Sequence, residues 1–404
     1  MLLFTRMRLA ISLLVLAAPA ALATTPAAAY DENDLKRKIA AEMRRAGGAS
    51  GAYVSDAATK RRIHSVRSSR SRIPASLEKL FTTSTALRTL GPDATLQTRA
   101  VTGGTVDAAG VLHGDLVLVG RGDPFFGARG AERIAGAIRS AGVRRIVGAV
   151  VGDETYFDRR RAGLLAGYDH ELPGVLSALA YDRGIHRGRA QLTAGRFAAQ
   201  RFAAELRRKG IRSTRRSRSG TAPAGAMVLA RWSSRDIGAI SKLINVPSDN
   251  FAAEMLLKGL GARYRGKGTT RHGASVVRQT LAELGARPRI RDGSGLARSN
   301  RTTPHQVVRM LEGMYPDAAG PAFRASLAVA GRSGTVAGRM RGTPAAGRCK
   351  LKTGTLSNVS ALAGYCRART GRDISFALLM NRVNPSGARA IQDRIAIAIA
   401  RLDG

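Results

Sequence analysis

Apolar residues recur at helical spacing in the first part of this chain. Residues 31–45 and 76–90 each carry one apolar stripe that ends at glycine, which predicts two helices. Between them, 52–54 and 63–66 flank a polar turn and predict a short hairpin. The N-terminal part therefore has a helix–hairpin–helix pattern.

The pattern changes further along the chain. From 95 to 158, short apolar runs are separated by Gly and Asp, which predicts a β-rich insert. Near the C-terminus, 349–355, 360–369 and 373–381 have the spacing of a three-stranded meander, and 388–402 has the stripe of a closing helix. These strands predict an antiparallel sheet.

Composition narrows the class of protein. The chain has 404 residues, of which 44% are hydrophobic, so it can build packed cores and is not of the disordered class. Lys and Arg number 66 against 28 Asp and Glu, and the net charge of +38 suits an anionic surrounding such as nucleic acid, a membrane surface or a bacterial wall. Two cysteines and six scattered histidines predict neither a disulfide scaffold nor a metal site, and no cofactor is expected.

Residues 1–29 have the features of a secretory signal peptide. Arg6 and Arg8 precede an apolar run that small residues follow. The alternatives are an uncleaved anchor and a buried apolar helix. Export predicts a periplasmic, cell-wall or outer-membrane-face location, with loose membrane association as one form of it. It also argues against nucleic acid as a partner, as does an aromatic content of 5%.

Three short motifs occur in a fixed order. They are Ser76-Leu77-Glu78-Lys79, Ser248-Asp249-Asn250 and Lys352-Thr353-Gly354. Each motif alone is weak evidence for a catalytic site, because a helix cap, a loop or a strand edge explains it equally well. The set is stronger, because it is typical of serine acyl-transfer enzymes and each motif has the expected context. The candidate catalytic residues are Ser76, Lys79, Ser248, Asn250 and Lys352.

The chemistry explains the first two motifs. Ser76 at a helix start places Lys79 one turn along, where a neutral amine can take the serine proton. Burial and the nearby Lys352 are expected to lower the Lys79 pKa, since both disfavour its charged form. Ser248 can relay a proton to the leaving amine, and Asn250 can hold a substrate amide while contacting Lys79.

The third motif predicts a strand that binds extended substrate. Gly354 lets a substrate backbone approach the strand. Thr353 and Thr355 are candidates for binding a terminal carboxylate, and the N–H of Thr355 completes an oxyanion hole.

With these motifs the chain resembles the low-molecular-mass class C penicillin-binding proteins, the D-alanyl-D-alanine carboxypeptidase/endopeptidase family. Besides the three motifs, ordered matches carry the resemblance, among them Gly122-Asp123-Pro124, Ala253-Glu254, Asp292-Gly293-Ser294-Gly295-Leu296, Asn300-Arg301 and Leu362-Ala363-Gly364-Tyr365.

The resemblance implies an α+β fold: a penicillin-recognising, transpeptidase-like (serine β-lactamase-like) domain whose antiparallel sheet has helices on both faces. That domain is expected over 30–95 plus 235–404, split by a β-rich insert over 96–234. The separation of Ser76 from Ser248 is too long for a class A β-lactamase. It is short for the best-known family members, so a second insert is expected to be reduced or absent.

The resemblance also implies the reaction. Ser76 attacks the peptide carbonyl of D-Ala-D-Ala, or of a D-Ala–diamino acid cross-link, in peptidoglycan stem peptides, and water hydrolyses the acyl-enzyme. β-Lactams are expected to acylate Ser76. Further candidate substrate-binding residues are Asp123, Arg301, Leu356 and Ser357. A turn carboxylate that caps backbone N–H groups is the alternative for Asp123.

Cys349 and Cys366 lie symmetrically about the turn near Ser357-Asn358, so they are expected to face each other across a hairpin. An oxidising compartment then predicts a disulfide; two free thiols are the alternative.

Two other functions stay open. One is a β-lactamase or esterase of the same fold, which would deacylate quickly. The other is a polyanion-binding cell-wall protein, for which the charge would attract wall polymers or a membrane surface.

Overall fold

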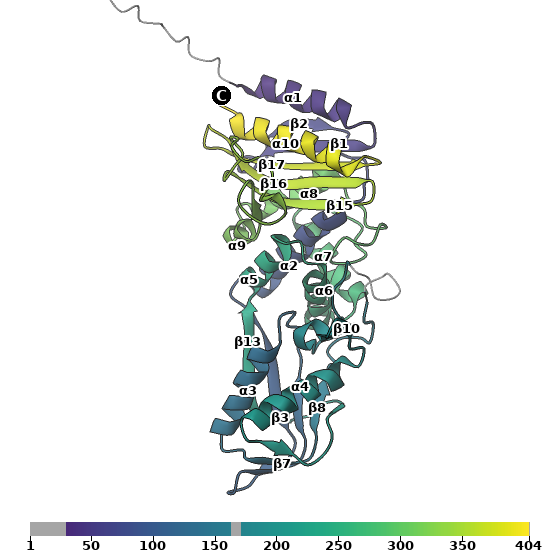
Figure 1. The fold of residues 1–404 in the computed structure, drawn as a ribbon. Helices are drawn as coiled ribbons and strands as arrows, with labels where there is room; N and C mark the ends of the chain where they lie inside the picture. The colour runs from purple at the N-terminus through teal and green to yellow at the C-terminus, as the bar shows by residue number, and fades with distance from the viewer. Residues whose placement is uncertain (1–29, 163–170, 404) are drawn as a thin grey trace, which may run out of the picture.

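A computed structural model describes residues 30–162 and 171–403, and the predicted signal peptide lies outside these residues. The molecule is elongated, with one sheet near each end and a group of helices between them (Figure 1). The N- and C-terminal segments of the described chain lie together at the same end.

A six-stranded antiparallel sheet is built from both ends of the chain. Its order is β14-β15-β16-β17-β1-β2. The strands are β14 (Ala328–Val329), β15 (Cys349–Leu356), β16 (Val359–Arg367), β17 (Asp373–Asn381), β1 (Ser50–Asp56) and β2 (Arg62–Val66). The meander predicted from the C-terminal pattern is confirmed, and β1 continues it by pairing with β17.

Helices cover both faces of this sheet. On one face, α1 (Glu32–Arg45) and α10 (Pro385–Arg401) share an apolar core with the sheet. On the other face lies a larger core. Its helices are η1 (Ala75–Leu77), α2 (Glu78–Leu90), α5 (Ile237–Asn245), α6 (Asn250–Arg265), α7 (Thr270–Glu283), α8 (Pro304–Met314) and α9 (Gly320–Ala325). The predicted α+β architecture, with helices on both faces, is confirmed.

The segment between α2 and α5 forms further sheets. A five-stranded sheet has the order β12-β8-β6-β3-β13, with β12 (Arg218–Ser219), β8 (Val150–Asp153), β6 (Leu116–Val119), β3 (Thr95–Thr102) and β13 (Met227–Asp236). A four-stranded sheet contains β11 (Arg212–Ser213), β7 (Arg145–Val147), β5 (Val111–His113) and β4 (Thr105–Val106). A small hairpin pairs β9 (Ile185–His186) with β10 (Arg189–Ala190).

Two helices pack on these sheets: α3 (Ala128–Ser140) and α4 (Ala194–Arg208). The β-rich pattern over 95–158 did not reveal α3. Its presence follows from topology, because β6 pairs with β8 in parallel and parallel neighbours need a crossover. The signal was a stripe of Ala131, Ile134 and Ile138 at helical spacing, all buried against the sheet.

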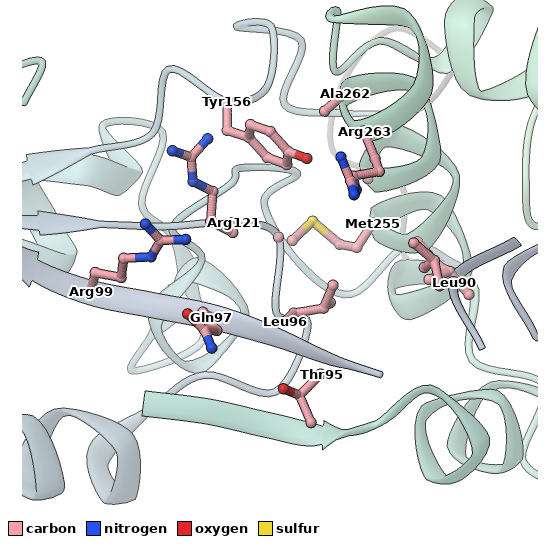
Figure 2. Close-up of a pocket in the computed structure, with 13 residues that line it drawn as sticks. Leu90, Thr95, Leu96, Gln97, Arg99, Arg121, Tyr156, Met255, Ala262 and Arg263 are labelled. Carbon is pink, nitrogen blue, oxygen red and sulfur yellow. The ribbon is translucent and has the colours of Figure 1, made fainter. Parts of the chain in front are cut away.

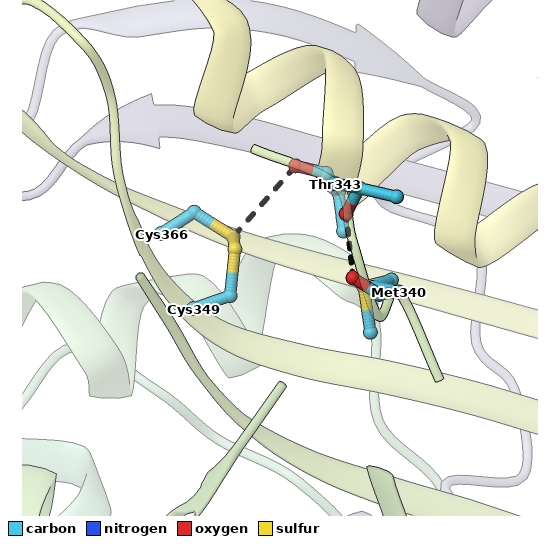
Figure 3. The surroundings of a disulfide bond; sticks show 5 residues. Met340, Thr343, Cys349 and Cys366 are labelled. Carbon is cyan, nitrogen blue, oxygen red and sulfur yellow. Dashed lines mark hydrogen bonds between the residues drawn. A yellow bond between two sulfur atoms is a disulfide. The ribbon is translucent and has the colours of Figure 1, made fainter. Parts of the chain in front are cut away.

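The predicted disulfide is present. Cys349 on β15 faces Cys366 on β16 in register, with a Cα–Cα distance of 4.0 Å, and the two sulfurs are joined (Figure 3). Both residues are fully buried in the core beneath α10. The link therefore ties together the two strands on which the third motif depends. Within 30–162 and 171–403, no helix is long and apolar enough to cross a membrane.

Candidate active site

The first motif lies where the η1 turn passes into α2. Ser76 is in η1 and Lys79 is in the first turn of α2. The preceding Ala75 has φ +50°, a left-handed conformation that disfavours a residue with a Cβ. Ala75 is completely buried, so the surrounding packing holds this turn in place. As a result the Lys79 Nζ lies 2.9 Å from the Ser76 Oγ.

Lys79 is the centre of a buried hydrogen-bond network. Its Nζ also donates to the Asn250 Oδ1 at 2.5 Å and to the Ser294 carbonyl oxygen at 2.6 Å. Burial lowers the Lys79 pKa to about 8, although the nearby carboxylates of Asp292 and Glu254 act in the opposite direction. A lysine with this pKa can exist as a neutral amine near physiological pH. The predicted contact between Lys79 and Asn250 is confirmed.

The second motif faces the third. Asp249 caps α6 by accepting a hydrogen bond from the Ala252 N–H, which places Asn250 at the start of the helix. Ser248 has φ +65°, a second left-handed residue at the site. The Lys352 Nζ donates to the Ser248 Oγ at 2.8 Å. Burial, together with the charge of Lys79, holds the Lys352 pKa well below its ordinary value.

The third motif runs along β15 beside the nucleophile turn. A Cβ on Gly354 would lie 2.6 Å from the Pro74 carbonyl oxygen and 3.2 Å from the backbone nitrogen of Ser76, so only glycine allows this approach. The Thr353 Oγ1 donates to the Thr335 Oγ1 at 2.7 Å, and Thr355 is exposed. The tight contact seen here is therefore between the strand and the nucleophile turn, and the approach of a substrate backbone to Gly354 stays a prediction.

Three buried carboxyl groups lie beneath Lys79, and none of them belongs to the five candidate catalytic residues. They belong to Glu78, Glu254 and Asp292. Burial is the main cause of a Glu254 pKa of about 7 and of a Glu78 pKa well above its ordinary range, and the Asp292 charge raises both further. Short sequence motifs do not predict this cluster, because its three carboxyl groups come from three separate segments of the chain.

These carboxyl groups hold the loop that contacts Lys79. The Glu254 Oε1 accepts hydrogen bonds from the N–H groups of Gly293 and Ser294, at 2.9 and 2.8 Å. The Asp292 carboxylate accepts from Gly295 N, Ala297 N and the Asn300 Nδ2, at 2.9, 2.6 and 2.6 Å. The loop so fixed presents the Ser294 carbonyl oxygen, not its hydroxyl, to Lys79.

The predicted substrate-binding residues outside the three motifs contact other groups of the protein. Asp123 is buried, and its carboxylate accepts hydrogen bonds from the Phe125 N–H at 2.9 Å and from the Trp232 Nε1 at 3.3 Å. The turn-capping interpretation of Asp123 thus describes its contacts, and its role towards substrate stays a prediction. The Arg301 guanidinium donates to the carbonyl oxygens of Arg298 and Asn300.

Leu356 ends β15 and Ser357 is exposed in the turn that follows. The side chain that reaches this turn is Arg298, which sequence reasoning missed. Its guanidinium donates to the Ser357 carbonyl oxygen at 3.1 Å and to the Asn358 Oδ1 at 2.8 Å. The sequence alone does not show whether Arg298 or Arg301 makes this contact; the folded loop does.

The insert also contacts the second motif. Arg183 forms an ion pair with Asp249, and the Asn250 Nδ2 donates to the Glu171 carbonyl oxygen at 2.5 Å. The Arg183 guanidinium also lies 5.1 Å from the centre of the Phe251 ring. The start of α6 is therefore held from both sides.

Comparisons with known proteins agree with this geometry. The D-alanyl-D-alanine carboxypeptidase of Actinomadura sp. (strain R39) is 30% identical over 446 residues, which cover 89% of this chain and 82% of that protein. Carboxypeptidase Rv3627c of Mycobacterium tuberculosis is also 30% identical, over 79% of this chain and 73% of its own length.

Among solved structures, penicillin-binding protein 4 of Haemophilus influenzae matches with a TM-score of 0.77 at 20% identity, over 88% of this chain and 97% of that chain. This likeness establishes the penicillin-recognising fold. The profile of the D-Ala-D-Ala carboxypeptidase 3 (S13) family matches residues 33–170 and 169–402. The chain therefore belongs to the D-Ala-D-Ala carboxypeptidase 3 (S13) family, a family of hydrolases.

Proposed function

We propose that this protein is an exported serine D,D-peptidase that cleaves D-Ala-D-Ala, or D-Ala–diamino acid cross-links, in peptidoglycan stem peptides. The observation that carries the proposal is the buried Lys79 ammonium shared by the Ser76 hydroxyl and the Asn250 amide oxygen. Family membership and the carboxypeptidase names of the relatives support the substrate class.

In the proposed mechanism, neutral Lys79 accepts the Ser76 proton as Oγ attacks the peptide carbonyl. The developing oxyanion is bound by the backbone N–H groups of Ser76 and Thr355, and the C-terminal carboxylate of the substrate is bound by Thr353 and Thr355. Ser248, hydrogen-bonded to Lys352, passes a proton to the leaving amine. Water then attacks the acyl-enzyme, and Lys79 serves as the base again.

The diamino acid end of the stem peptide is assigned to the segment around Asp123, Arg301, Leu356 and Ser357. Buried Asp123 has its pKa raised by desolvation, so contact with a cationic substrate group would favour its charged form. We further propose boundaries at 30–95 plus 235–404 for the catalytic domain and 96–234 for the insert, with no second insert of full size. β3 and β13, which begin and end the insert, pair along their length and form its neck.

β-Lactams are expected to acylate Ser76. A solved structure of penicillin-binding protein 4 of H. influenzae contains a β-lactam, and a Bdellovibrio bacteriovorus endopeptidase of this fold was solved acylated by penicillin G. The net charge of +38 is proposed to hold the enzyme near anionic wall polymers or the membrane surface.

The test is covalent labelling with a fluorescent penicillin. The wild type should give a stable band that Ser76→Ala abolishes. Ser294→Ala is the matched control, because this neighbouring serine contributes its carbonyl to the site and should leave the label in place. Release of D-Ala from a stem peptide, lost in the same variant, would establish the peptidase. A label that vanishes within minutes would instead identify a β-lactamase, and no label on folded protein would overturn the catalytic proposal.

A further inference from the structure

A cavity lies between the insert and the helices that carry the motifs (Figure 2). Its volume is about 590 Å³, and its walls come from β3, from the segment after β6 and from α6, with Leu90 of α2 at one side. None of the five candidate catalytic residues lines it. The cavity is therefore distinct from the catalytic residues, although Gly122, which lines it, precedes Asp123 of the predicted substrate pocket.

The sequence pattern explains how the polar lining is assembled. Thr95, Leu96, Gln97 and Arg99 of β3 all line the cavity, so the start of this strand contributes consecutive positions to it. Gly259 and Arg263 are four residues apart on α6 and share a face of the helix. Two independent elements thus direct side chains into the same space.

Three guanidinium groups converge on this cavity: those of Arg99, Arg121 and Arg263. Figure 2 shows Arg99 and Arg121 near one another and Arg263 across from them, with the Tyr156 ring between Arg121 and Arg263. The Arg121 guanidinium lies 4.7 Å from the centre of that ring. Each cation approaches the space from a different direction.

No acidic side chain balances these charges. The lining contains neither Asp nor Glu. In the described part of the chain, no ion pair joins Arg99, Arg121 or Arg263 to a carboxylate, and the buried Nε of Arg99 has no hydrogen-bond partner. An anion in the cavity would give the unpaired Arg99 Nε an acceptor and would face three guanidinium groups that have no carboxylate partner.

We propose that this cavity binds a phosphodiester with a polyol substituent, such as a glycerol phosphodiester. Tetrahedral phosphate presents oxygens in several directions and accepts from three separate guanidinium groups, whereas a planar carboxylate is satisfied by one bidentate arginine. Thr95 and Gln97 face the polyol hydroxyl groups, and Leu96 and Met255 pack on its carbon chain. The shared chemistry could be supplied by a lipid headgroup or by a soluble or polymeric glycerol phosphate.

The site leaves the nucleophile free. Leu90, where α2 meets the cavity, is eleven residues beyond Lys79, about 16 Å along the helix axis. A bound phosphodiester would therefore occupy the protein without blocking Ser76. The acylation rate thus reports on the active site independently, and this proposal does not depend on the proposed function.

Calorimetric titration with glycerophosphoglycerol, and separately with inorganic phosphate, tests the site. We expect saturable binding by the full-length mature protein, about tenfold weaker in Arg121→Gln and in Arg263→Gln, as for the loss of one charge-assisted hydrogen bond. Arg207→Gln on α4 is the matched control; it removes one exposed, unpaired positive charge and should change binding by less than about twofold. Penicillin acylation by every variant should stay at the wild-type rate. Because Arg263 is exposed, its replacement leaves the core intact.

Vesicles of phosphatidylcholine with phosphatidylglycerol distinguish the sources. Vesicle binding that Arg121→Gln weakens and glycerophosphoglycerol competes away would identify a lipid headgroup. Vesicle binding that is equal in all variants, beside Arg121-dependent binding of the soluble diester, would identify a non-lipid phosphate. Two results would overturn the proposal: no saturable binding of either soluble probe, or equal weakening by Arg207→Gln.

Discussion

A carboxyl group that holds its proton near neutral pH lies beneath the general base. Glu254 is 1% exposed, and one of its carboxyl oxygens has no hydrogen-bond partner in the described structure. Burial and the Asp292 charge raise its pKa from 4.5 to about 7, against the two backbone N–H groups that favour the ionised form. Glu254→Gln keeps an oxygen for those N–H groups and removes the titration.

The magnitude follows from proton linkage. Below pH 4.5 Glu254 is protonated in both the folded and the unfolded state, and between pH 4.5 and 7 only the folded state keeps the proton. Folding stability therefore falls as pH rises through this window. At about 1.4 kcal/mol per pH unit the fall approaches about 3 kcal/mol, and it is complete above pH 7. The Gln variant lacks this decline.

Urea unfolding at pH 4.5, 5.5, 6.5 and 8, followed by far-ultraviolet circular dichroism, measures the effect. The stability of Glu254→Gln relative to wild type should rise by about 3 kcal/mol from the lowest pH to the highest. Trp232, the only tryptophan, lies in β13 of the insert, so its fluorescence monitors unfolding there separately. Glu132→Gln, at an exposed site on α3, controls for the loss of one negative charge.

The same variant tests the link to catalysis. The ionised Glu254 raises the Lys79 pKa, so its removal should move the rise of the penicillin acylation rate to lower pH. A merely structural role would lower the rate without moving the profile. A stability difference that is constant from pH 4.5 to 8, within about 0.5 kcal/mol, would refute the assignment of this titration to Glu254.

Two further predictions concern the strand that carries the third motif. Gly354→Ala drives a Cβ against the Pro74 carbonyl and should slow acylation about 100-fold, as expected for a misplaced reacting group, while Gly338→Ala, where a Cβ meets nothing within 4 Å, should acylate normally. Replacing Cys349 and Cys366 together by Ala should lower the free energy of unfolding by about 3 kcal/mol, the value expected for their sequence separation of 17, and urea midpoints measure this loss. Alkylation of both thiols in the native, unreduced protein would contradict the second prediction.

The sequence predicted those features of the site that short local motifs encode. The S-x-x-K, S-D-N and K-T-G segments predicted a serine–lysine site, and the structure brings Ser76, Lys79 and Asn250 within hydrogen-bond reach. The symmetry of Cys349 and Cys366 about a turn predicted their pairing, since an antiparallel register follows from the turn. The spacing of Ser76 and Lys79 is set within one turn of helix, and the pairing of the two cysteines is set within one hairpin. The approach of one motif to another depends on segments that are distant in sequence.

Other features depend on segments distant in sequence, and no local pattern encodes them. Lys79 was expected to owe its lowered pKa partly to Lys352. Burial is the main cause of the lowered pKa values of both Lys79 and Lys352, and repulsion between the two like charges adds to the lowering at Lys352. The carboxyl groups of Glu254 and Asp292, which oppose the lowering, come from a helix and a loop that meet only in the fold. Likewise, the sequence does not predict the left-handed conformation of Ala75, because alanine has no preference for positive φ.

The insert has a structural role in the site beyond any contact with substrate. Ser248 is held in a left-handed conformation that costs free energy, and the next residue, Asp249, caps α6 while paired with Arg183 of the insert. Without Arg183, the Asp249 carboxylate would still cap the helix, but its second oxygen would lose its cation. The Asn250 amide is fixed in the same way, donating to the Glu171 carbonyl on one side and accepting from Lys79 on the other. Because a strained residue persists only where its neighbours over-determine it, the insert is part of what keeps the second motif aligned with Ser76.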